Sequence, residues 1–159
     1  FRSPTYLFNL INFIIEAKNS IGIYYMLLTK ASEYALLSIL CISDKKDPID
    51  VENLSTSLMI SRRFLAKILQ KLTKAGILNS FKGVKGGFVL AKKVEDISVL
   101  DIIRAVEDNP AIVFECTSDN GVCSSNKASM CSIWPTLNKL QIKIDDFLSD
   151  IKLHDILVK

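Results

Sequence analysis

The sequence predicts a mainly α-helical fold with a small β-wing: a winged helix-turn-helix domain followed by a long C-terminal dimerisation helix. Three observations support this fold class: two short helical patterns separated by a brief turn, a glycine-rich hairpin pattern directly after them, and a regular apolar repeat near the C-terminus. The 159 residues are 49% hydrophobic and 23% charged, so the chain has enough apolar side chains for a globular core and is not a disordered protein.

Residues 1–25 are predicted to be an extension outside the fold. The segment Leu7–Ile15 is apolar, but Asn9 and Asn12 interrupt it, and roughly 18 unbroken apolar residues would be needed to cross a bilayer. No secretory signal is evident. The pattern changes at Met26, which resembles a natural start. We therefore expect no membrane association and a cytoplasmic location.

The first two helices are predicted from their caps and their apolar spacing. Thr29 can cap a helix that runs to about Ile42. Its inward face is expected to hold Tyr34, Leu37, Leu40 and Cys41. A polar turn follows at residues 44–48. Asp50 can then cap a short helix whose apolar face contains Val51, Leu54 and Leu58.

The third helix has the clearest pattern. A tight turn at residues 59–60 precedes Ser61, a good N-cap residue, and Gly76 supplies a left-handed residue that can end the helix. Its apolar stripe consists of Phe64, Leu65, Ile68, Leu69 and Leu72. The opposite face is polar and mostly basic. Two short helices with a brief turn between them, the second one basic, form a helix-turn-helix pattern.

A hairpin is predicted directly after the third helix. Residues 77–81 and 88–91 are expected to form strands around a glycine-rich tip at 82–87, which carries Lys82 and Lys85. The glycines permit positive φ and let backbone N–H groups approach a phosphate closely. A nucleotide-binding phosphate loop is excluded, because the spacing is wrong and no helix with Ser or Thr follows Lys85. The hairpin is therefore interpreted as a wing.

The charges are distributed unevenly along the chain. Between Ser61 and Lys93 there are nine basic residues and no acidic one, whereas most acidic residues follow Val94. This pattern favours a polyanion-binding face, and we assign residues 26–108 to a winged-helix DNA-binding domain. The residues expected to enter the major groove are Arg62, Arg63 and Lys67. Those expected to meet phosphates or base edges are Ser61, Gln70, Lys71, Lys82 and Lys85.

The C-terminal part is predicted to contain two further helices and a loop. Ser98 and Asp101 match a capping box that opens a helix ending near residues 108–110. A cysteine loop is expected at 109–132, and a dimerisation helix with a tail at 133–159. The apolar residues of that helix follow a strict a/d spacing: Ile133, Leu137, Leu140, Ile144, Phe147 and Ile151. The pattern favours a homodimer seam over packing within one chain, because core helices usually have a broader apolar face.

Several of these motifs together resemble the Rrf2 family of bacterial regulators. They are Thr29-Lys30 with Glu33-Tyr34-Ala35-Leu36, Ile60-Ser61 with Phe64-Leu65, the segment 72–77 and the wing at 80–90. The resemblance covers residues 26–153. It implies a winged-helix homodimer that binds palindromic promoter DNA and, for many members, an iron–sulfur cluster held by three loop cysteines. The family wing commonly reads Arg-Gly-Pro-Gly-Gly. Lys82 replaces that arginine here, which keeps the attraction to phosphate but loses a bidentate fork.

Three of the four cysteines lie close together in the sequence. Cys116, Cys123 and Cys131 are separated by six and seven residues, and thiolates are the usual ligands of cluster iron. With the family resemblance, this predicts an iron–sulfur cluster of the 2Fe–2S or 4Fe–4S type. Zinc is disfavoured because no Cys-x-x-Cys pair is present, and three ordinary loop thiols are the remaining alternative. Clustered thiols of this kind also fit a reducing compartment.

The fourth ligand of such a cluster is predicted from the resemblance. IscR-like members have a histidine three positions after the last cysteine, where this chain has Trp134. NsrR-like members use an acidic residue of the partner subunit's first helix, and Glu33 occupies that position; the alternative is that Glu33 is simply a solvated helix residue. Cys41 is expected to be a core residue and His154 a surface residue.

The predicted function is a DNA-binding transcriptional regulator, most simply a repressor. Its promoter affinity would depend on an iron–sulfur cluster that responds to nitric oxide, iron or redox state. The alternative is a cluster-free winged-helix regulator controlled by a protein partner or a small molecule. CymR-like members are of this kind, although they lack the three-cysteine loop. An enzyme is disfavoured, because a nucleophilic cysteine would need a nearby base and His154 is the only histidine.

Overall fold

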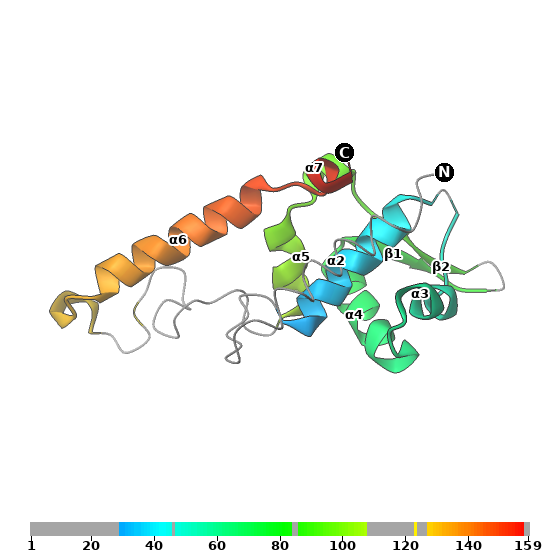
Figure 1. Cartoon of the computed structure of the whole chain (residues 1–159), viewed down its shortest axis with the longest axis horizontal. Coiled ribbons are helices and arrows are strands. Elements are labelled where there is room, and N and C mark those ends of the chain that lie inside the picture. Colours follow the sequence, from blue (N-terminus) through cyan, green and yellow to red (C-terminus); the bar gives the residue numbers. More distant parts are fainter. Residues whose placement is uncertain (1–28, 46, 84–85, 108–122, 124–126, 158–159) are drawn as a thin grey trace, which may run out of the picture.

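The computed structural model describes residues 29–45, 47–83, 86–107, 123 and 127–157 (Figure 1). Its elements, in chain order, are α2 (Lys30–Ser43), α3 (Val51–Leu58), α4 (Arg62–Lys74), β1 (Leu78–Phe81), β2 (Gly87–Leu90), η1 (Val94–Asp96), α5 (Val99–Val106), η3 (Ala128–Met130), α6 (Trp134–Asp150) and α7 (Leu153–Leu157). The predicted fold class, mainly helical with a two-stranded wing, is confirmed. Residues 1–25 and 109–122, on which two of the domain predictions rest, lie outside the described residues.

Side-chain caps begin three of the helices as the sequence predicts. The Thr29 hydroxyl accepts a hydrogen bond from the Ala31 amide at 3.1 Å, and the Asp50 carboxylate accepts one from the Asn53 amide at 2.9 Å. Ser98 and Asp101 form both hydrogen bonds of a capping box at the start of α5. Each cap satisfies amide groups that have no partner within the helix.

Ser61 differs from these three. It occupies the N-cap position of α4, but its side chain makes no capping hydrogen bond. Ser61 therefore marks the start of the helix as predicted, but its hydroxyl does not cap the helix.

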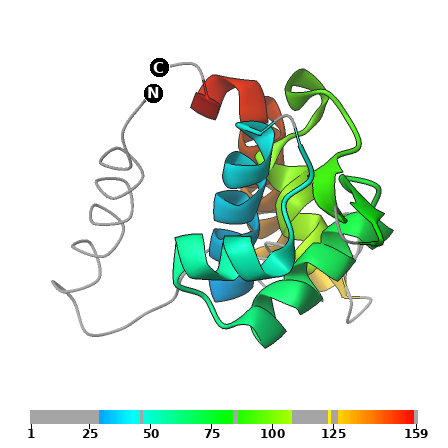
Figure 2. The same cartoon turned by 90° about the vertical axis from the view of Figure 1, so that its right-hand side faces the viewer.

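The core lies where α2, α4 and α5 pack against one another (Figure 2). From α4, Leu65, Leu69 and Leu72 are fully buried, and truncation of such a leucine to alanine costs about 2–5 kcal/mol. The predicted apolar stripe of α4 contains one residue that is not buried: Phe64 lies at the edge of the stripe and is 39% exposed.

The inward face of α2 is turned relative to the prediction. Its fully buried apolar residues are Ala35, Ile39 and Ile42. Of the predicted set, only Leu37 is buried, and Tyr34, Leu40 and Cys41 are half-buried at the margin of the core. The prediction was wrong in phase because α2 packs against α5, α4, β2 and α3, so its apolar residues do not lie on one narrow face.

The wing is fixed to the helices at its base. β1 and β2 are antiparallel, with Leu78 opposite Leu90 and Phe81 opposite Gly87. Phe88 also exchanges two main-chain hydrogen bonds with Ile49, in the segment before α3. A side chain at Gly87 would meet the Ile49 carbonyl at 2.6 Å, so this close approach of two backbones requires a glycine.

The chain returns to the winged-helix domain after α6. Val99 donates its amide to the Ile151 carbonyl at 3.0 Å, and Leu153 donates to the Ile97 carbonyl at 2.8 Å. The short helix α7 follows; the sequence predicted only a tail here. α5 ends at Val106, earlier than predicted, because Glu107 is already extended. Leu148 of α6 packs with Val99, Leu100 and Ile103 of α5 in a second, smaller core.

Most of α6 projects away from the remainder of the fold (Figure 1). Pro135 lies in its first turn, as predicted. Along the predicted seam, Ile133 is 59%, Leu140 42% and Phe147 64% exposed. In one chain these large apolar side chains therefore face solvent. None of the helices within the described ranges is long and apolar enough to cross a membrane.

Candidate nucleic-acid interface and cysteine site

The turn between α3 and α4 positions the basic helix. Met59 ends α3 with a positive φ of 53°, which is uncommon for a residue other than glycine. Ile60 is buried and its amide bonds to the Ser55 carbonyl. These contacts fix where α4 begins, and α4 carries no acidic residue in its first turn. The unpartnered amides of that turn therefore add to the positive potential of the basic side chains.

The exposed face of α4 carries most of the predicted DNA-contacting residues. Ser61, Arg63, Lys67 and Gln70 are all exposed. Arg62 is exposed as well, but its guanidinium makes an ion pair with Glu52 of α3 at 3.1 Å. Both side chains of that pair are more than 60% exposed, so the ion pair is weak and phosphate can replace it.

Lys71 does not belong to this exposed face. It is half-buried, and its ammonium donates a 2.7 Å hydrogen bond to the main-chain carbonyl of Val106. This contact within the chain differs from the predicted role of Lys71 in contacting DNA. It could not be predicted from the sequence, because the partner is a carbonyl 35 residues away.

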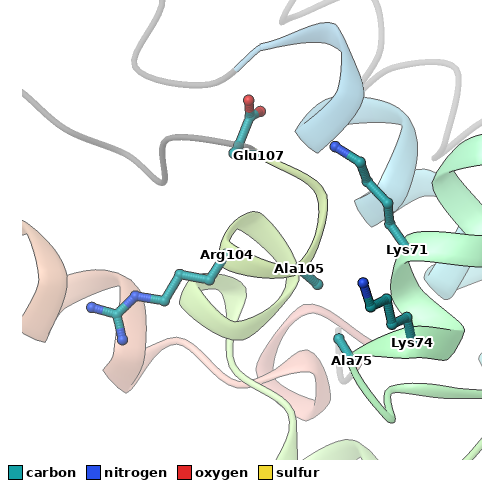
Figure 3. A pocket seen from close by; sticks show the side chains of 6 residues that line it. All are labelled: Lys71, Lys74, Ala75, Arg104, Ala105 and Glu107. Atoms are coloured by element: carbon teal, nitrogen blue, oxygen red, sulfur yellow. The ribbon is translucent and has the colours of Figure 1, made fainter.

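Lys71 borders a pocket of about 390 Å³ between α4 and α5 (Figure 3). Lys74 and Ala75 line it from α4, and Ala105 and Glu107 from α5 and its end. Arg104 also borders the pocket, but its guanidinium points away toward α6. There it pairs with Asp145 at 3.2 Å, so it contributes to the packing of α5 against α6.

The wing also carries an exposed cation. Lys82 follows β1 and is exposed. Lys85, the other predicted wing contact, lies outside the described residues. An exposed lysine at this position suits a wing that contacts the phosphate backbone next to the groove.

Two of the three clustered cysteines are described. Cys123 is buried, Cys131 is half-buried, and both are free thiols. Cys116 lies outside the described residues. Within the described ranges, no group of three His, Cys, Asp or Glu side chains could hold a metal ion. Glu33 of the same chain is thus not gathered with Cys123 and Cys131.

Glu33 lies in the first turn of α2, and its side chain is only 13% exposed. Its carboxylate accepts a hydrogen bond from the Lys30 ammonium at 2.5 Å. It is therefore a covered, ion-paired group rather than a solvated one. A ligand role for Glu33 would require the cysteine loop of a second subunit, as the sequence analysis expects.

His154 lies on the surface, as predicted, whereas Cys41 lies at the margin of the core rather than within it. Cys41 packs at the margin of the core. Burial raises the pKa of its thiol, Asp44 raises it further and Lys45 lowers it, so the thiolate form that binds metal is disfavoured. His154 is exposed and lies 3.7 Å from Glu95 on the surface.

The sequence did not predict the contacts that the beginning of α2 makes with the end of α5 and with α4. Glu107, just after α5, accepts hydrogen bonds from the Thr29 and Ser32 hydroxyls at the start of α2. Tyr34 makes an edge-on contact with Phe64 of α4. The hydroxyl and aromatic residues at the beginning of α2 could have suggested such contacts. Their partners could not be identified, because they are distant in sequence.

Comparisons with known proteins agree with this geometry. The model of the Rrf2 family, described as an iron-dependent transcriptional regulator, matches residues 28–159. An HTH-type transcriptional regulator of Aquifex aeolicus is 31% identical over 83% of this chain and 92% of its own length. The HTH-type transcriptional regulator IscR of Vibrio atlanticus is 28% identical over 83% of this chain and 75% of its own length.

A solved structure shares the fold. CymR, the global cysteine regulator of B. subtilis, superposes with a TM-score of 0.63 at 20% identity, over 82% of this chain and 95% of its own. These relatives and this neighbour are transcriptional regulators, not enzymes.

Proposed function

We propose, from the premise that this chain belongs to the Rrf2 family of transcriptional regulators, that it binds palindromic promoter DNA as a homodimer and represses transcription. The observation that carries the proposal is the exposed basic face of α4, with Arg63 and Lys67, together with the exposed wing residue Lys82. In this mode Arg62, Arg63 and Lys67 contact base edges in the major groove. Ser61, Gln70, Lys82 and Lys85 contact phosphates or base edges and fix the register.

The dimer is supported by α6. Ile133, Leu140 and Phe147 recur along one seam and are exposed in the single chain. A second α6 packed along this seam would bury them, in a two-fold arrangement of the kind that most soluble oligomers use. Two copies of α4 would then face DNA with a fixed spacing, as a palindrome requires.

We further propose that Cys116, Cys123 and Cys131 hold an iron–sulfur cluster, with Glu33 of the partner subunit as the fourth ligand. The donor set fits, because Cys123 and Cys131 are free thiols and sulfur is the preferred ligand of cluster iron. When bound, such a cluster supplies a centre that is sensitive to nitric oxide, iron supply and redox state. The cysteine loop then joins two subunits through α2, which packs against α4.

A cluster-free regulator is the second candidate. It is favoured by the fold shared with CymR, described as a global cysteine regulator, and by the absence of a three-ligand group among the described residues of one chain. In this case a protein partner or a small molecule would control promoter affinity, and the loop thiols would carry no metal.

Anaerobic purification separates the two candidates. We expect a brown protein with iron, acid-labile sulfide and a cluster mass in the native mass spectrum. Cys123→Ser should remove all three signals, while the matched variant Cys41→Ser keeps them, because Cys41 lies at the core margin. A colourless, iron-free wild-type protein would favour the cluster-free regulator.

A further inference from the structure

A row of four side chains connects the first turn of α2 to the first turn of α4. The Lys30 ammonium donates to the Glu33 carboxylate at 2.5 Å and lies 5.4 Å from the centre of the Tyr34 ring. The Tyr34 ring meets the Phe64 ring edge-on, with centroids 5.9 Å apart and planes at 81°. Both geometries are those of attractive contacts, a cation over an aromatic face and a T-shaped aromatic pair.

Phe64 lies among the residues that face DNA. It follows Arg62 and Arg63 on α4 and is itself 39% exposed, whereas the next residue, Leu65, is fully buried. The buried leucine anchors the helix to the core. Phe64 thus lies beside the buried leucine at the margin of the core. A shift of the Tyr34 ring against the Phe64 ring can therefore move the first turn of α4.

We propose that Tyr34 is a positioning residue that sets the orientation of the first turn of α4 according to the state of Glu33. This inference rests on the proposed function, in which the Glu33 carboxylate binds a cluster held by the cysteine loop of the partner subunit. Lys30 then loses the carboxylate that holds it at 2.5 Å. Its ammonium moves relative to the Tyr34 ring, and the ring shifts against Phe64. The signal passes through side-chain contacts within one chain, and no contact of Glu33 with DNA is needed.

Tyr34→Leu tests the inference, with Tyr34→Phe as the matched control because it keeps the ring. A DNA duplex selected from random sequence by the wild-type protein serves as the probe, and affinities are measured at fixed salt for cluster-loaded and cluster-free dimers. We expect the ratio of the two affinities to fall toward one in Tyr34→Leu and to stay at the wild-type value in Tyr34→Phe. The cluster spectrum should be the same in all three proteins.

Two further measurements extend the test, and the second of them needs no cluster-loaded protein. Lys30→Gln alters a side chain that is 44% exposed and leaves the core intact, and we expect it to lower the affinity ratio as Tyr34→Leu does. In cluster-free protein, Tyr34→Leu and Phe64→Leu should shift the melting temperature less together than the sum of their separate shifts, because they remove the same contact.

The outcomes distinguish the inference from the function it rests on. Equal affinities of cluster-loaded and cluster-free wild-type dimers would overturn the proposed control of DNA binding, and the inference with it. A wild-type ratio that persists unchanged in both Tyr34→Leu and Lys30→Gln would leave the function standing and overturn the inference alone. Additive melting shifts would also contradict it.

Discussion

The ammonium of Lys71 donates a 2.7 Å hydrogen bond to the main-chain carbonyl of Val106, and this bond ties the basic helix α4 to the last turn of α5. A carbonyl in the last turn of a helix has no partner within the helix, so the lysine satisfies a group that would otherwise need water. Lys67, one turn earlier on α4, is exposed. Two lysines on one helix thus have different roles.

Lys71→Met and Lys67→Met should therefore differ in their effects: the first should change the stability of the protein, and the second its binding to DNA. Lys71→Met is expected to lower the melting temperature, since a lost hydrogen bond to a charged group costs about 1.5–3 kcal/mol, and to leave the salt dependence of DNA binding unchanged. Lys67→Met should leave the melting temperature unchanged. It should weaken operator binding by about 1–3 kcal/mol, the usual value of a base-edge contact in the major groove. A reduced salt dependence of DNA binding in Lys71→Met would place that residue in the DNA interface.

The base of the wing should tolerate no side chain at Gly87. A Cβ there would lie 2.6 Å from the carbonyl carbon and oxygen of Ile49, so Gly87→Ala must push the wing away from the segment before α3. We expect a lower melting temperature and weaker DNA binding. Gly83→Ala is the matched control, because its φ of 108° is strained but no atom lies within 4 Å. Equal effects of the two variants would show that the contact with Ile49 does not matter.

Charge on the α6 seam should separate the subunits. Phe147 is 64% exposed in the single chain, and a carboxylate in the proposed seam would be buried beside its symmetry mate. Phe147→Asp is therefore expected to give a monomer in light scattering and to weaken operator binding. Lys143→Asp changes the charge at an exposed position of the same helix outside the seam and should remain dimeric. A dimeric Phe147→Asp protein would place the interface elsewhere.

The capping box of α5 predicts a specific pH dependence. Burial raises the pKa of Asp101. The hydrogen bonds from the Ser98 hydroxyl and amide, together with the charges of Lys92 and Lys152, outweigh burial and hold the pKa below the ordinary value of 3.8. The stabilisation is therefore full above pH 3.8 and is lost as the pH falls through the lower folded pKa.

Ser98→Ala tests this dependence. At neutral pH we expect it to cost about 0.5–2 kcal/mol in urea unfolding, the usual value of a lost N-cap. The difference from wild type should shrink below pH 3.8, because protonated Asp101 no longer accepts both hydrogen bonds. A difference that stays constant down to the acid transition would mean that Asp101 takes no part in it.

Local patterns in the sequence predicted the elements well. Thr29, Asp50 and Ser98 began their helices as expected, because a cap depends only on residues two or three positions away. The phase of α2 and the role of Lys71 could not be predicted in this way. Both depend on contacts with α5, which is distant in sequence, and no local pattern encodes such contacts.

Only part of the candidate site could be predicted from the sequence. The exposed positions of Arg63 and Lys67 follow from helical periodicity, since the buried leucines of α4 fix its other face. The row of contacts from Glu33 to Phe64 could not be predicted from the sequence. Tyr34 was expected to point into the core, whereas its ring contacts α4 at the margin of the core. The cluster ligands rest on spacing and resemblance, and Cys116 lies outside the described residues.

The iron–sulfur switch is tested most directly by the affinity of the wild-type dimer for one operator duplex, measured before and after its cluster is removed, at a single salt concentration. We expect tight binding by the anaerobically purified, cluster-loaded protein and clearly weaker binding once nitric oxide or a chelator has removed the iron, with the dimer intact. Equal affinity in both states would contradict it and leave a promoter-binding dimer without an iron–sulfur switch.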